Sequence, residues 1–257
     1  LSLSAADAAP DRDRCKAMTR VRFVVGGWLL ALCIASVGAQ APESEVPIKE
    51  LGDGRYQVGR IIVDKPARSF SVEAKLIHTE DPLEYLAVAR RGVKDYESLL
   101  ELRTRGLHFN IACILIGLDD TGVVHPRFQF DETVVEGPEV SIKIRWEGDD
   151  GSVEIDAADA LRIVGAPDGP PRETRWIYTG SVMYPSDPPT YLADSSGSLI
   201  GFVHDPMTVI EHQLGLGIGA YGSILGNTDI LPPVGTRMTL IVAALPASAE
   251  SGDGATE

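Results

Sequence analysis

An apolar run in the middle of the chain, LHFNIACILIGL at Leu107 to Leu118, constrains the fold more than any other feature. Large aliphatic residues recur along it at the spacing of one helical face: Leu107, Ile111, Ile114, Leu115 and Leu118. The other faces are also apolar, so the run predicts a helix that protein encloses on all sides. At about a dozen residues it is shorter than the roughly 20 that cross a bilayer. We therefore expect Ile114→Asp to unfold the domain.

Alternating apolar and polar residues on both sides of this run predict strands. The clearest are Phe70 to Leu76 and Val140 to Trp146, and a last apolar strand is expected at Thr239 to Leu245. Leu83 to Ala89 and Glu97 to Leu102 are predicted to form a hairpin around the charged turn between them. The fold class that follows is α+β, mainly antiparallel β, with one central buried helix at about 107–117 and minor short helices.

The two ends of the chain have different patterns from its middle. Residues 1–39 are expected to be a leader, because Arg20 and Arg22 precede an apolar run and then small residues, as in a signal peptide. Met18 is the first methionine and the expected start of translation. Residues 40–54 are predicted to be a tether, 55–245 a single domain and 246–257 a disordered acidic tail. A chain of this kind is expected in the periplasm or outside the cell.

Charge and cysteine content restrict the partners. The formal net charge of −14 at pH 7 argues against nucleic acid and anionic membrane surfaces, since both attract clustered Lys and Arg. No stable membrane span is expected once the leader is removed. Cys33 follows the apolar run of the leader, but the bulky Leu32 before it argues against lipid anchoring there. The mature chain would retain only Cys113, so no intramolecular disulfide can form.

One glycine motif has the spacing of a dinucleotide-binding site but lacks the helix and the acidic residue that such a site requires. Gly217, Gly219 and Gly222 spell G-x-G-x-x-G within the apolar loop at Gly215 to Gly222. The following Pro232-Pro233 ends any helix early, and no acid lies between Asp229 and Glu250 to contact a ribose. No cofactor is therefore predicted.

The histidines do not have a tight metal-binding spacing. His204 and His212 are the weak candidates, because with their neighbours Asp205 and Glu211 they would converge if the segment between them folded back. No metal site is predicted from this pattern. His108, at the start of the apolar run, is interpreted as orienting the helix rather than as a general base.

Several segments together resemble the YdjY-domain family of bacterial proteins, which are mostly exported. They are LEYLAVARRGVKDYESLLEL, RWIYTGSVMY, YLADSSGSLIGFVHDP and NTDILPPVGTRMTLIV. The family usually has His-Glu-Ser where this chain has Tyr96-Glu97-Ser98, so a histidine-dependent role at that position is not carried over. The resemblance implies no established reaction, and the tyrosine favours binding over catalysis.

Three function classes follow from these observations. The first is a non-catalytic binding or assembly domain with a groove for a peptide, glycan or partner protein, formed near Glu97, Ser98, Trp176, Tyr178 and Asn227. The second is a hydrolase or a metal- or redox-linked accessory enzyme of the cell envelope, using Glu97 with His108, or His204 and His212. The third is a purely structural envelope component.

Overall fold

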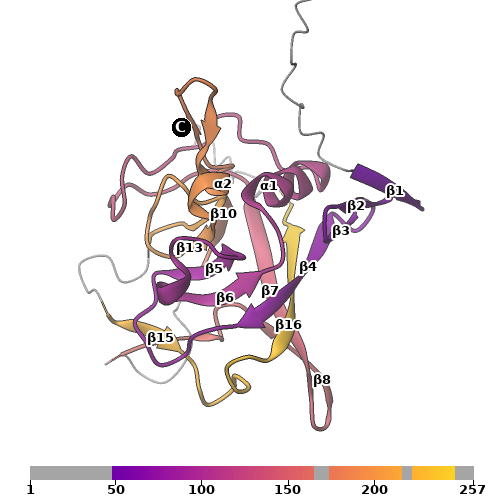
Figure 1. Cartoon of the computed structure of the whole chain (residues 1–257), viewed down its shortest axis with the longest axis vertical. Helices are drawn as coiled ribbons and strands as arrows, with labels where there is room; N and C mark the ends of the chain where they lie inside the picture. Colours follow the sequence, from indigo (N-terminus) through magenta and orange to yellow (C-terminus); the bar gives the residue numbers. More distant parts are fainter. Residues whose placement is uncertain (1–47, 165–173, 216–221, 247–257) are drawn as a thin grey trace, which may run out of the picture. The chain divides into compact units, whose positions relative to one another are not determined.

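The computed structural model describes residues 48–164, 174–215 and 222–246 (Figure 1). Within these ranges the protein is mostly β. The helices described are α1 (Gly106–Leu115), α2 (Leu192–Ser196) and a single 3-10 turn at Asp95–Glu97. The strands are β1 (Ile48–Gly52), β2 (Arg55–Val58), β3 (Ile61–Asp64), β4 (Ser69–Leu76), β5 (Tyr85–Ala89), β6 (Ser98–Leu102), β7 (Glu139–Gly148), β8 (Gly151–Asp156), β9 (Leu161–Ile163), β10 (Trp176–Tyr178), β11 (Met183–Tyr184), β12 (Thr190–Tyr191), β13 (Ser198–Gly201), β14 (Ile210–His212), β15 (Ile224–Gly226) and β16 (Arg237–Ala244).

Eight of the strands close into a barrel. They pair in the order β4-β16-β7-β10-β14-β13-β5-β6, and pairing between β4 and β6 completes the ring. Most neighbours are antiparallel, but β5 with β6 and β13 with β14 are parallel. Strands β1 to β3 extend from the β4 side and β8 from β7, and both extensions project outward in Figure 1. A barrel of this size has an interior that side chains alone can fill.

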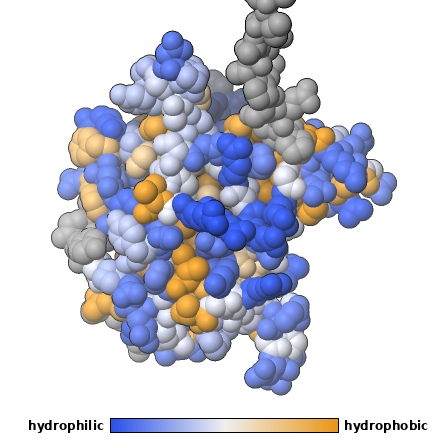
Figure 2. Space-filling view, in the orientation of Figure 1, coloured by the Kyte–Doolittle hydropathy of each residue, from blue (hydrophilic) through white to orange (hydrophobic). Residues whose placement is uncertain are grey.

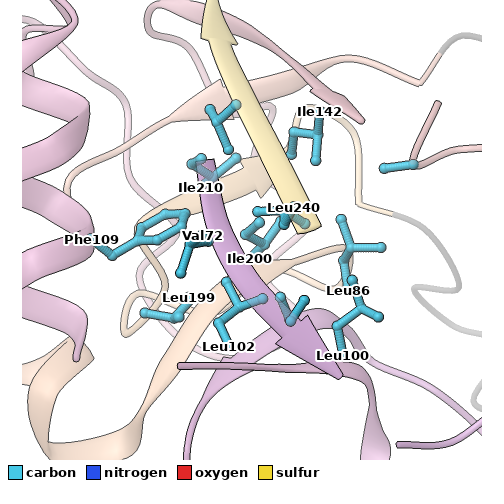
Figure 3. Close-up of a cluster of buried hydrophobic side chains, with 14 of the residues drawn as sticks. Val72, Leu86, Leu100, Leu102, Phe109, Ile142, Leu199, Ile200, Ile210 and Leu240 are labelled. Atoms are coloured by element: carbon cyan, nitrogen blue, oxygen red, sulfur yellow. The ribbon is translucent and has the colours of Figure 1, made fainter. Parts of the chain in front are cut away.

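The predicted strand alternation is confirmed on β4 and β7, and β16 is present where a last apolar strand was expected. On β4, Phe70, Val72, Ala74 and Leu76 are buried, whereas the residues between them are at least partly exposed. Figure 3 shows aliphatic side chains from several strands meeting in one cluster, among them Val72, Leu100, Ile142, Ile200, Ile210 and Leu240. Each such buried side chain contributes roughly 1.5–3 kcal/mol.

Helix α1 is present where the apolar run predicted it, but a different face is buried. Phe109, Ala112, Cys113 and Ile116 are buried, whereas Ile114 is 54% exposed. Figure 3 shows Phe109 pointing from α1 into the core, where its ring meets the edge of Phe70 at 5.2 Å between centroids. The prediction that Ile114 is buried is wrong. A helix that is apolar on every face does not reveal by its spacing which face packs.

Two further corrections concern the backbone. Strand β1 occupies Ile48–Gly52, within the range expected to be a tether, because it pairs with β2. The hairpin predicted for residues 83–102 is instead the parallel pair β5 and β6. The connecting residues 90–97 carry the chain back to the start of β5, where the Glu84 N–H donates to the Glu97 carbonyl at 2.9 Å. Alternation predicts strands but contains no information about their direction.

The remaining predictions about the ends of the chain concern residues outside the described ranges. These are the leader, the first part of the tether and nearly all of the tail. The loop at Gly215 to Gly222 is also mostly outside them. In the part of the chain that the structure describes, no helix has the length and apolar character needed to cross a membrane.

Candidate functional site

The parallel pairing of β5 and β6 brings like charges together at both of their ends. Their register keeps a constant offset of thirteen residues, from Tyr85 opposite Ser98 to Ala89 opposite Leu102. Glu84 and Glu97 immediately precede the two strands, and Arg90 and Arg103 immediately follow them. Two carboxyl groups therefore meet at one end and two guanidinium groups lie at the other.

The carboxyl pair, Glu84 and Glu97, is nearly enclosed, with each residue 4% exposed. Lys94 Nζ lies 2.5 Å from Glu97 Oε1 and 4.0 Å from Glu84 Oε2. On the other side, Gln129 Nε2 donates to Glu84 Oε2 at 2.8 Å. Burial and the negative charge of Glu97 raise the pKa of Glu84 to about 7, although Lys94 opposes the shift. Close to neutral pH, Glu84 can therefore gain or lose a proton.

Ser98 and Tyr85 surround the pair with further hydrogen bonds. Ser98 Oγ donates to the Lys94 carbonyl at 2.6 Å and so holds the turn that carries Lys94. Tyr85 Oη donates to Asp205 Oδ2 at 2.6 Å and lies 3.5 Å from Gln129 Nε2. Burial, followed by the charge of Asp205, raises the pKa of Tyr85 far above its usual value, so its hydroxyl stays protonated as a donor.

The segment from His204 to His212 folds back on itself, as the metal hypothesis required. The Asp205 N–H donates to Glu211 Oε1 at 3.0 Å, and the Thr208 hydroxyl donates to the same oxygen. His204 Nδ1 and Nε2 contact the carbonyl oxygens of Asp131 and His212 at 2.5 and 2.9 Å. Both ring nitrogens of His204 therefore already have protein partners.

The titratable side chains in this fold-back are buried. Burial raises the pKa of Glu211 well above its usual range, and burial together with His204 lowers the pKa of His212 to about 4. The rings of His212 and Trp176 are perpendicular, with 5.7 Å between their centroids. Within residues 48–164, 174–215 and 222–246, no group of three or more His, Cys, Asp or Glu side chains is arranged to hold a metal.

The other predicted site residues lie on separate elements. Trp176 and Tyr178 are on β10, and Tyr178 Oη donates to Asn110 Oδ1 on α1 at 2.7 Å. Asn227 donates through Nδ2 to the Asp159 carbonyl at 3.0 Å. Of the predicted site residues, Glu97 and Ser98 belong to the group around the carboxyl pair. Tyr178 and Asn227 instead bond to Asn110 and Asp159, outside that group. A ligand role for any of these residues stays a prediction.

Three exposed aromatic residues, Tyr96, Phe128 and Phe130, belong to the segments that hold the carboxyl pair, and we call them the aromatic rim. Lys94 Nζ lies 5.8 Å from the centroid of the Tyr96 ring. Phe128 and Phe130 flank Gln129, whose side chain reaches Glu84. Phe130 has a φ of 66°, which is unfavourable for a bulky residue, and its N–H donates to the His204 carbonyl at 2.8 Å. The loop is held in this conformation by the enclosed network.

Four residues of this site, Glu84, Tyr85, Lys94 and Gln129, were not predicted from the sequence. A usable signal was present, because Glu84 and Arg90 have the same six-residue separation as Glu97 and Arg103. Two strands that each begin after Glu and end before Arg would bring like charges together if they ran parallel. Gln129 lies in an irregular segment, and no pattern in the sequence predicts its contact with Glu84.

Comparisons with known proteins identify a family but no characterised relative. A family model described as YdjY domain matches residues 61–243, which is well over half of the chain. No curated protein matches the chain, and no solved structure does.

Proposed function

This chain belongs to the YdjY-domain family, and we propose that it is an exported, non-catalytic binding domain of the cell envelope. Export rests on the signal-peptide pattern in residues 1–39. The observation that carries the binding role is the aromatic rim beside a polar group whose members already bond one another. Glu97 is held by Lys94, Glu84 by Gln129 and Asp205 by Tyr85. Such a group supports a rigid surface rather than a reactive atom.

Of the three ligand classes expected, the rim favours a glycan. Exposed rings supply flat apolar faces at low cost in conformational entropy, and sugars present apolar C–H faces of similar size. Lys94 Nζ lies 5.8 Å from the centroid of the Tyr96 ring, and Gln129 lies between Phe128 and Phe130 in the chain. Both side chains are hydrogen-bond donors from which sugar hydroxyl groups can accept. A largely preformed site of aromatic residues with a few polar groups is the usual form of a small-ligand site.

The test is the binding of soluble peptidoglycan fragments to the mature protein by isothermal titration calorimetry. Phe128→Ala is expected to weaken binding by about tenfold, because truncating an exposed aromatic anchor commonly costs more than 1 kcal/mol. Met183→Ala, another exposed apolar residue, is the matched control and should bind as the unmodified protein does. Equal effects of the two variants, or binding only to peptides, would contradict a glycan-binding rim.

A hydrolase is the second candidate, and one observation favours it. The pKa of Glu84 near 7 suits a general acid or base at neutral pH, with Glu97 as the neighbouring carboxylate. Glu97→Gln would then abolish turnover of a glycoside or ester while leaving the circular dichroism spectrum unchanged. Under the binding proposal, no substrate is turned over by either protein.

A further inference from the structure

A cavity of about 600 Å³ lies at the arginine end of β5 and β6, opposite to the carboxyl pair. Four arginines line it, Arg60, Arg90, Arg103 and Arg105, together with His108. Figure 2 shows strongly hydrophilic surface in the middle of this face, below helix α1. Such a concentration of guanidinium groups is unexpected in a chain with a net charge of −14.

Protein carboxylates balance only part of this charge. Arg103 pairs with Glu73 at 2.8 Å, and Arg105 pairs with Asp194 at 2.5 Å. Arg60 and Arg90 are exposed, and no ion pair joins either of them to a carboxylate within the described part of the chain. Four arginines against two acids leave two positive charges in the cavity. A bound anion would neutralise this excess positive charge, and its attraction to the guanidinium groups is strongest at low salt.

The arginines converge from separate elements. Arg60 precedes β3, Arg90 follows β5, and Arg103 and Arg105 connect β6 to α1. The first turn of α1 is not itself the source of the site, because the Leu107 N–H already donates to Asp194 Oδ1 at 2.9 Å. Guanidinium forks that approach from different directions match a tetrahedral oxyanion, which accepts hydrogen bonds on several sides.

We propose that this cavity binds a doubly charged phosphate group. Arg60 and Arg90 supply the charge that no protein group neutralises, and Arg103 and Arg105 are oriented by their carboxylate partners. The cavity is much larger than a phosphate ion, so it has room for the rest of a phosphate ester as well as for the free ion. This site is independent of the aromatic rim, because the two lie at opposite ends of the β5–β6 pair.

Three ligand sources share this chemistry and are tested separately by calorimetry at low salt. The probes are inorganic phosphate, glycerol 3-phosphate, and phosphatidylcholine vesicles with and without phosphatidic acid. Succinate is the comparison dianion without a phosphate. We expect saturable binding of at least one phosphate probe and at least tenfold weaker binding of succinate. The tightest phosphate probe identifies the source as the free ion, a soluble ester or a lipid headgroup.

Arg60→Gln and Arg90→Gln test the site itself. Each is expected to weaken binding of the best phosphate probe by about tenfold, and the double variant to abolish it. Arg237→Gln is the matched control, since it removes the same charge from an exposed arginine that does not line the cavity, and it should change binding less than about twofold. All three side chains are exposed, so thermal melting should be unaltered. The proposal would be overturned if Arg237→Gln weakened phosphate binding as much as Arg60→Gln and Arg90→Gln do. Succinate binding as tight as phosphate binding, or no saturable binding of any phosphate probe, would also overturn it.

Discussion

Glu84 is the residue whose protonation differs most from what its position in the sequence indicates. In the sequence it is one acid beside an apolar strand, but in the fold it meets Glu97 in a nearly enclosed position. Burial and the second carboxylate both disfavour its ionised form. Its protonation is therefore coupled to the stability of the fold.

Glu84→Gln should remove one component of the pH dependence of stability. Because the folded pKa of about 7 exceeds the unfolded value, Glu84 binds its proton more tightly in the folded state, and the free energy of unfolding falls as pH rises from about 4.5 to 7. In the unmodified protein, Glu84 is expected to lower the free energy of unfolding by roughly 1–3 kcal/mol over this pH range, and Glu84→Gln should lack this decrease. Urea unfolding of both proteins across pH 4.5–8 measures the difference.

The His212 pKa of about 4 acts in the opposite direction, since stability is lost as pH falls from about 6.5 to 4. This component is the same in the unmodified protein and in Glu84→Gln, so subtracting the two curves isolates Glu84. Parallel curves for the two proteins would show that the carboxyl pair does not share a proton.

A second residue-scale prediction concerns Gly106 at the start of α1. A Cβ there would lie 2.4 Å from the carbonyl carbon of Ala193, and backbone cannot move aside as a side chain can. Gly106→Ala should lower the free energy of unfolding by more than about 2 kcal/mol through overpacking. Gly148→Ala is the control, because its nearest contacts lie at 3.4 Å, and it should change stability by less than about 1 kcal/mol. Chemical denaturation of both variants checks the difference.

At the scale of elements, α1 shows how an apolar helix selects its buried face. Its spacing pointed to the face with Ile114, but Phe109 is the residue that enters the core. The neighbours of the helix decide this, since α1 packs beside β2, β3, β13 and α2. An all-apolar helix can meet such neighbours in several orientations, and only the surfaces that it meets distinguish between them.

The sequence predicted that a substitution at Ile114 would unfold the domain, but the structure predicts the large loss of stability at Phe109 instead. Phe109→Ala should cost about 3–5 kcal/mol, because it removes a fully buried ring and leaves a cavity. Ile114→Asp should cost less than about 1 kcal/mol, because the side chain already faces solvent. Thermal melting of the two variants distinguishes these outcomes. Unfolding by Ile114→Asp would mean that this face of α1 is covered.

At the scale of the whole described domain, closure of the barrel determines which strands are most stable. Strand β16 is hydrogen-bonded on both sides, to β4 and to β7. Among the described strands, β1 pairs only with β2, and all five of its residues are exposed. Local opening should therefore begin in the extensions and reach the barrel last.

Hydrogen exchange followed by mass spectrometry tests this order. Amides of β4, β7 and β16 should exchange slowest, at rates that approach the global unfolding limit, whereas those of β1 should exchange orders of magnitude faster. Protection of β1 equal to that of β16 would indicate that its outer edge is paired in solution.

The amino-acid sequence by itself determined the family resemblance, the position of α1, the alternation of β4 and β7, the last apolar strand, and Glu97 and Ser98 as polar residues at a strand start. These features depend on contacts within a few residues or on the local choice between apolar and polar side chains. Only the tertiary structure decided that β5 and β6 run parallel, that Glu84 meets Glu97, and that arginines from separate segments surround one cavity. Direction and pairing of strands depend on long-range contacts, which no local pattern in the chain encodes.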